Sequence, residues 1–213
     1  MVRVLDGDTL PVSGVSLTLH RIGRTAQGAI DSSTSATDGR FRFRRPADST
    51  AIYLVSARYA GIEYFGELMR APGSDRALVL VSDTSSTAPL SLGGRHIMIR
   101  RPDESGARAV LDLFSIRNDG PYTRVSAGAD APTWSLLLPA GATDPEVEQG
   151  EVSGAAIRFS GDTLLLLAPV SPGQKNVMVS YTLPPGVDRP RWAAPTDTFD
   201  ILVEEPGATV RGA

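Results

Sequence analysis

The chain has no cysteine, a single lysine at Lys175 and only two histidines, His20 and His96. The absence of cysteine excludes disulfides, thiolate metal ligands and cysteine nucleophiles. A serine hydrolase needs a histidine base beside its nucleophile, and no Gly-x-Ser-x-Gly motif accompanies either histidine. Both histidines stand at the ends of expected strands, which favours a surface position over a catalytic one. We therefore predict no catalytic residue.

Long apolar runs and a strong net charge are also missing. No stretch approaches the roughly 18 apolar residues that span a bilayer, and no charged-then-apolar leader precedes the first strand. Two interpretations remain: a cytoplasmic chain, or an exported chain from which a leader has been removed. We expect the second. The formal net charge of −3 provides no clustered basic surface, so we expect no nucleic-acid partner.

Metal-binding patterns are weak. Asp6-Gly7-Asp8 has alternate carboxylates of the kind that bind calcium, but the later acidic ligands of such a loop are absent, so we interpret it as a turn. Asp103-Glu104 and Glu204-Glu205 are adjacent pairs whose side chains diverge on a strand, and neither pair predicts a glycosidase site. We expect neither a metal nor a cofactor.

Turn residues and alternating apolar residues are abundant. The 21 glycines and 16 prolines are spread along the whole chain, as frequent turns between short strands require. Apolar residues recur with a period of two, for example in 12–19, in 39–45, where Phe41 and Phe43 share one face, and in 176–183. These patterns predict an all-β protein made of two consecutive antiparallel β-sandwich domains.

The domain boundary is predicted from a polar segment, 83–89, which is rich in serine and threonine and ends in proline. We interpret this segment as a linker. It separates a first domain over 1–82 from a second over 90–205, and 206–213 form a tail.

The first domain resembles the carboxypeptidase regulatory-like family. The resemblance rests on four segments in order: 4–8 (VLDGD), 10–17 (LPVSGVSL), 35–43 (SATDGRFRF) and 53–61 (YLVSARYAG). It implies a transthyretin-like, seven-stranded β-sandwich over roughly residues 1–82. Members of this family are mostly accessory modules of exported and cell-envelope proteins. The histidine set of the hydroxyisourate hydrolase that shares the transthyretin-like fold is missing here.

The second domain resembles a β-sandwich that often follows such modules in bacterial envelope proteins. The resemblance rests on 111–120, on the segment from Trp134 to Pro139 and on 172–184. It implies an architecture and no activity.

Arginines and one tryptophan are the candidate docking residues. Arginine is favoured at protein interfaces, and a tryptophan flanked by arginines in a proline-rich segment is a plausible interface anchor. The alternative interpretation of the arginines is that they lie on a solvent-exposed sheet face. The alternative for Trp192 is that it closes one end of the core. The candidates are Arg42, Arg44, Arg45, Arg100, Arg101, Arg191 and Trp192.

We expect a non-catalytic structural or interaction protein of the bacterial envelope, located in the periplasm, in the cell envelope or outside the cell, and peripheral to the membrane. Its partners would be protein subunits of a larger membrane-bound complex of the respiratory, secretory or photosynthetic kind, with contact to the membrane surface left open. The alternatives are a carbohydrate- or ligand-binding module, which the aromatic content of 6% disfavours, and a hydrolase.

Overall fold

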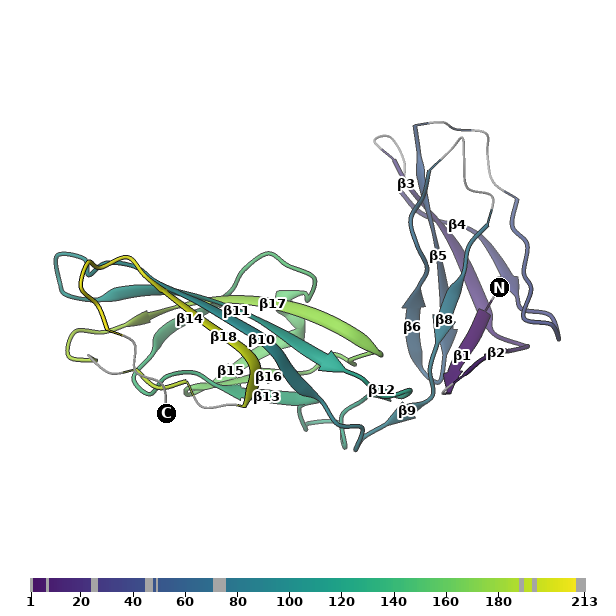
Figure 1. Ribbon diagram of the computed structural model, residues 1–213. Helices are drawn as coiled ribbons and strands as arrows, with labels where there is room; N and C mark the ends of the chain where they lie inside the picture. The colour runs from purple at the N-terminus through teal and green to yellow at the C-terminus, as the bar shows by residue number, and fades with distance from the viewer. Residues whose placement is uncertain are drawn as a thin grey trace. The chain divides into compact units, whose positions relative to one another are not determined.

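The computed structural model describes the backbone in residues 2–6, 8–23, 27–44, 48, 50–70, 76–187, 190–192 and 195–209 (Figure 1). These residues form β-strands joined by turns, with one short 3-10 helix, η1 (Gly154–Ala156). The protein is therefore all-β, as its alternating pattern predicts. Across this described part of the chain, no helix has the length and apolar character needed to cross a membrane.

The chain divides into two compact units. Unit 1 comprises 1–84 together with 121–123, and unit 2 comprises 85–120 and 124–213. The segment 83–89, which the sequence suggests as a linker, contains strand β9 (Thr84–Ser85), and Ala88 within it is buried. Strand β12 (Thr123–Arg124) pairs with β9. Residues 121–123 fall inside the predicted second domain but group with unit 1.

Unit 1 contains two sheets. The larger sheet, called here the β3 sheet, has the order β4-β3-β5-β6 with β7 also paired to β5, and its pairings are antiparallel. The smaller has the order β2-β1-β8, in which β1 and β8 are parallel. The strands are β1 (Val2–Asp6), β2 (Asp8–Pro11), β3 (Ser16–Ile22), β4 (Gly28–Thr34), β5 (Ile52–Tyr59), β6 (Ile62–Phe65), β7 (Met69–Arg70) and β8 (Val79–Val81).

The core of unit 1 follows the period-two pattern. Leu17 and Leu19 on β3, and Tyr53 and Val55 on β5, are buried together with Val79 and Val81 of β8. Alternate residues of each strand point to this core because successive side chains of a strand face opposite sides. In the alternating segment 12–19, Val15, Leu17 and Leu19 are buried and Val12 is half-buried.

The alternation in 39–45 predicts a strand, and this prediction is wrong: residues 39–44, which the structure describes, belong to no strand. The alternation is nevertheless real. Phe41 and Phe43 are half-buried against the core of unit 1, in an edge-to-face contact with ring centroids 5.5 Å apart. Arginines at 40, 42 and 44 are exposed. The segment packs on the core without joining a ladder.

Unit 2 also contains two sheets. The larger, called here the β10 sheet, has the order β14-β17-β11-β10-β18, and β18 runs parallel to β10 whereas the other pairs are antiparallel (Figure 1). The smaller is antiparallel with the order β13-β16-β15. The strands are β10 (Ser91–Ile99), β11 (Arg108–Asn118), β13 (Trp134–Leu137), β14 (Thr143–Val147), β15 (Ile157–Ser160), β16 (Thr163–Leu166), β17 (Gly173–Leu183) and β18 (Thr196–Val203).

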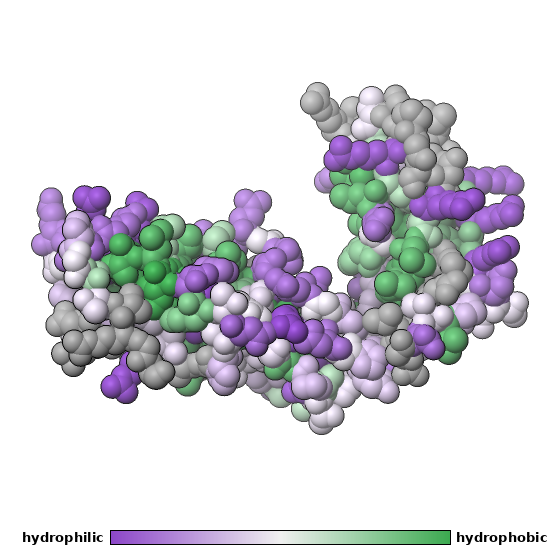
Figure 2. Space-filling model, in the orientation of Figure 1, coloured by the Kyte–Doolittle hydropathy of each residue, from purple (hydrophilic) through white to green (hydrophobic). Residues whose placement is uncertain are grey.

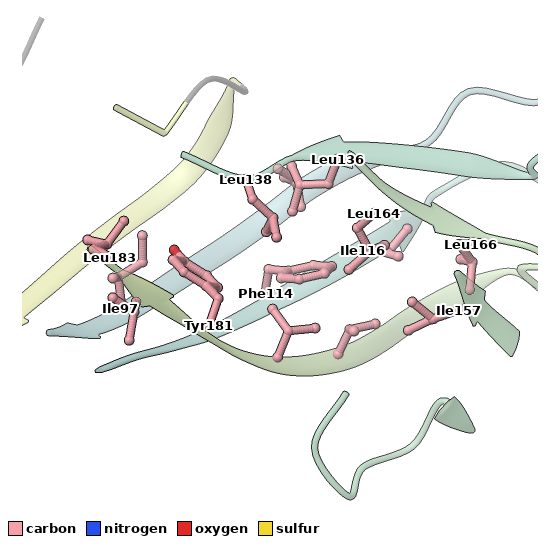
Figure 3. Close-up of a cluster of buried hydrophobic side chains, with 14 of the residues drawn as sticks. Ile97, Phe114, Ile116, Leu136, Leu138, Ile157, Leu164, Leu166, Tyr181 and Leu183 are labelled. Carbon is pink, nitrogen blue, oxygen red and sulfur yellow. The ribbon is translucent and has the colours of Figure 1, made fainter. Parts of the chain in front are cut away.

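The core of unit 2 is formed by side chains of both sheets. Phe114 and Ile116 of β11 lie close to Leu164 and Leu166 of β16 in one buried cluster (Figure 3). Phe114 also packs against Trp134, with ring centroids 5.8 Å apart. One face of the β10 sheet is therefore covered, and the opposite face, called here the outer face, carries the side chains in the other phase of each strand.

Candidate functional site

The outer face of the β10 sheet carries an apolar patch. The strand registers place Met98 opposite both Leu111 and Leu202, and Leu113 opposite Met178, so the five side chains form two adjoining rows. Leu202 is 58% exposed and Leu113 is 36% exposed, and the other three are half-buried. Figure 2 shows apolar surface over this part of unit 2. We call these five residues the apolar patch.

Charged pairs lie beside the apolar patch. His96 is opposite Leu113 on the ladder, and its Nδ1 lies 2.9 Å from a carboxylate oxygen of Asp200. Arg100 pairs with Glu204, with 3.0 Å between the guanidinium and the carboxylate. An apolar centre with a charged rim is the usual composition of a protein interface.

A polar depression of about 510 Å³ adjoins the patch where β10 carries two glycines. The register between β10 and β11 shifts between Leu92 and Gly94, and the missing side chains leave the surface hollow. A Cβ on Gly93 would lie 2.3 Å from Cδ of Arg117, so the stem of Arg117 lies directly over this glycine. The depression is lined by Gly93, Gly94, His96, Ser115, Arg117, Gln174 and Thr198.

The guanidinium of Arg117 is held by carboxylates. It lies 2.6 Å from Asp119 and also pairs with Asp197 of β18. The hydrogen bond and charge of Asp119, with the charge of Asp197, raise the pKa of Arg117 above its ordinary value. The two carboxylates therefore hold the side chain of Arg117 in place on the surface between β11 and β18.

A buried polar network lies under the outer face. Arg95 and Asp112, which are 1% and 0% exposed, form two hydrogen bonds: Nε to Oδ1 at 2.9 Å and Nη2 to Oδ2 at 2.5 Å. The hydroxyl of Tyr181 lies 3.2 Å from Oδ2 of Asp112, and Nε1 of Trp192 donates to that hydroxyl at 2.7 Å. Burial, and then the charge of Asp112, raise the pKa of Tyr181 well above its ordinary value.

Sequence reasoning missed this network although the sequence carries a signal for it. Asp112 lies in phase with Val110, Phe114 and Ile116, all of which are buried. Arg95 is likewise in phase with Ile97 and Ile99. A charged residue in the core phase of two adjacent strands indicates a buried pair.

A histidine and a serine are in hydrogen-bond contact in unit 1. Nε2 of His20 lies 2.8 Å from Oγ of Ser56, across β3 and β5. Ser56 is only 2% exposed, so its hydroxyl is inaccessible to a substrate carbonyl. His20 lies within β3, two residues before its end, and its hydrogen bond satisfies a buried hydroxyl.

The predicted docking residues are distributed over both units. Arg42 and Arg44 are exposed in unit 1, and the backbone N–H of Arg44 donates to a carboxylate oxygen of Asp31 at 3.1 Å. Arg45 lies outside the described residues. In unit 2, Arg100 is paired with Glu204 as described above, and Arg101 and Arg191 are exposed.

Trp192 has its ring against the core of unit 2 and 6.2 Å from the ring of Phe199. Of the two interpretations that the sequence leaves open for this residue, the structure favours the end of the core. Its indole N–H is already engaged by Tyr181.

Metal ligands are not gathered anywhere in the ranges that the structure describes: no three histidine or acidic side chains there are placed to hold an ion together. No family model matches the chain, and no curated protein matches it. The structure therefore describes an all-β protein in which an exposed apolar sheet face lies beside a polar depression.

Proposed function

We propose that the protein is a non-catalytic interaction protein that binds another protein subunit through the outer face of the β10 sheet. The observation that carries this proposal is the apolar patch of Met98, Leu111, Leu113, Met178 and Leu202. Burying exposed leucine and methionine side chains is favourable by about 25 cal/mol for each Å² removed from water. A contiguous apolar surface with a charged rim is typical of a protein-binding site.

The proposal includes a finer description of the fold and the location. Each unit would be a β-sandwich, with unit 1 of the transthyretin-like type found in the carboxypeptidase regulatory-like family. The supporting features are the paired sheets of each unit and the family-type segments, of which 53–61 includes most of β5 and 10–17 ends in the first two residues of β3. The protein would act in the bacterial envelope as an extrinsic subunit of a membrane-bound complex.

A second candidate function is binding of a carbohydrate or another small polar ligand in the polar depression. Ser115, Arg117 and Gln174 provide hydrogen-bonding groups there. The described lining includes no phenylalanine, tyrosine or tryptophan on which a sugar ring would stack, and the depression is shallow. A glycan array tests this candidate, and binding that Gln174→Ala abolishes would favour it over a protein partner.

The experiment for the main proposal is purification of the tagged full chain, under mild detergent, from the cells that produce it. We expect the wild-type chain to be recovered with other subunits in a fixed ratio. The variant Leu113→Glu/Leu202→Glu places two carboxylates in the patch and should lose these subunits. Leu137→Glu, which changes an exposed leucine of the smaller sheet in unit 2, is the matched control and should keep them.

Recovery of the wild-type chain as a free monomer would contradict the proposal. Retention of every subunit by the double variant would also contradict it, because the patch would then contribute nothing. Circular dichroism of each variant distinguishes a lost contact from a lost fold.

A further inference from the structure

The two edges of the β10 sheet differ in their capacity to accept another strand. On the β14 edge, Pro145 lacks an N–H, Asp144 has a left-handed backbone with φ of 52°, and the register shifts between Thr143 and Glu146. Such interruptions are a common protection of sheet edges. On the opposite edge, β18 is paired in continuous register from Thr198 to Val203 and contains neither proline nor lysine.

The free backbone groups of β18 follow from its pairing. The N–H of Glu204 donates to the carbonyl of Ile99 at 3.0 Å, so even-numbered residues of this strand direct their backbone groups toward β10. The odd-numbered residues Phe199, Ile201 and Val203 direct theirs away from it. Within the described part of the chain, these outward N–H and C=O groups have no hydrogen-bond partner. They form a template for one further strand.

The charge at this edge is negative. Asp197 and Asp200 are exposed on β18, with side chains 61% and 65% exposed, and the strand contains no basic residue. Asp119 and Asp197 pair with the guanidinium of Arg117, whereas Asp200 pairs with His96, which adds a positive charge only when protonated. A second copy of the same edge would meet like charges, whereas a strand with lysine or arginine would meet opposite ones.

We propose that the β18 edge binds an extended, lysine- or arginine-bearing segment of a partner protein by β-strand addition. The incoming strand pairs with the outward groups of Phe199, Ile201 and Val203, and its basic side chains lie near Asp197 and Asp200. Its apolar side chains contact Leu202 on the outer face, which joins the edge to the apolar patch. The inference rests on the proposed function and adds the chemistry of the partner.

The test uses the full chain and synthetic ten-residue peptides followed by NMR. The probe alternates valine and lysine. One control alternates valine and glutamate, and a second keeps the lysines but replaces two central valines with proline, which prevents strand pairing while retaining the charge. We expect the first peptide to slow hydrogen exchange at least tenfold at the amides of Phe199, Ile201 and Val203. Neither control peptide should do so.

Variants locate the effect. Asp197→Lys/Asp200→Lys should abolish the protection, and Asp197→Asn/Asp200→Asn should weaken it with the shape of the edge retained. Glu146→Lys changes an exposed carboxylate on the β14 edge and is the matched control, which should bind the peptide as the wild type does. The amide spectrum of each variant reports whether it is folded.

The inference is overturned if the valine–lysine peptide gives no protection, if protection falls on β14, or if the proline peptide is equally effective. Concentration-dependent dimerisation of the free chain through β18 would also overturn it, because the occupant would then be a second copy. Its failure differs from failure of the proposed function. If only the inference on the β18 edge fails, Leu113→Glu/Leu202→Glu still loses the native subunits, whereas Asp197→Lys/Asp200→Lys retains them.

Discussion

The indole N–H of Trp192 donates to the hydroxyl of Tyr181 at 2.7 Å, which attaches the segment before β18 to β17 of the same sheet. The same hydroxyl reaches Asp112, so one tyrosine oxygen connects a surface segment with a buried ion pair. Both tryptophans of the chain, Trp134 and Trp192, belong to unit 2, so tryptophan fluorescence reports the unfolding of this unit.

Tyr181→Phe should lower the free energy of unfolding of unit 2 by about 1–3 kcal/mol, because buried polar groups of Trp192 and Asp112 lose a partner. Urea unfolding followed by tryptophan fluorescence measures the change. Trp192→Phe and the double variant complete a thermodynamic cycle. Additive effects of the two substitutions would argue against a shared hydrogen bond.

Asp112→Leu should destabilise unit 2 more strongly, by about 3–5 kcal/mol, because it leaves the guanidinium of Arg95 buried without a counter-ion. Arg95→Met/Asp112→Leu removes both charges and should recover most of this loss. The same unfolding measurement compares the three proteins. A double variant that is less stable than Asp112→Leu would mean that the ion pair is required by the fold itself.

Gly93→Ala should disturb the polar depression, whereas Gly94→Ala should not. A Cβ at Gly93 would lie 2.3 Å from Cδ of Arg117. A Cβ at Gly94 would lie at least 3.7 Å from every residue other than the two adjacent in sequence. The arginine must move and loses its contact with Asp119 or Asp197. NMR of the arginine side chain should show this displacement in the first variant only, and identical spectra would contradict the prediction.

Alkaline pH should destabilise unit 1 through Tyr59. Its hydroxyl donates to Asp83 at 2.7 Å, and this hydrogen bond, with burial, raises the pKa of Tyr59 to about 12 from an ordinary value of 10.0. The neutral form is favoured by folding, so this stabilisation is present below pH 10 and is lost as the pH rises toward 12. Ultraviolet titration of tyrosinate in wild type and Tyr59→Phe measures it, and the variant should lack one late-titrating tyrosine.

The fold class follows from the sequence because period-two alternation reports directly which side chains face a core. The same signal is incomplete where a segment packs without pairing: Phe41 and Phe43 alternate correctly, yet residues 39–44 join no ladder. Strand β4 (Gly28–Thr34) is the opposite case. Its residues, which are mostly small or polar, give no apolar alternation, yet the strand pairs with β3.

The candidate surface was harder to predict than the core. On β11, Leu111 and Leu113 stand between buried residues, so the strand has apolar side chains in both phases. Such a strand is equally compatible with burial on two faces. Only the tertiary arrangement, in which the second sheet covers one face of the β10 sheet, identifies which apolar residues are exposed.

The parallel pairing of β18 with β10 has a consequence for biosynthesis. These two strands are separated by about a hundred residues, and contacts between such distant segments form late because closing a long loop costs entropy. While the ribosome is still translating, β10 has its antiparallel neighbour β11 but an unpaired opposite side. The nascent chain is then most exposed to aggregation, and a chaperone that shields β10 at this stage would protect it.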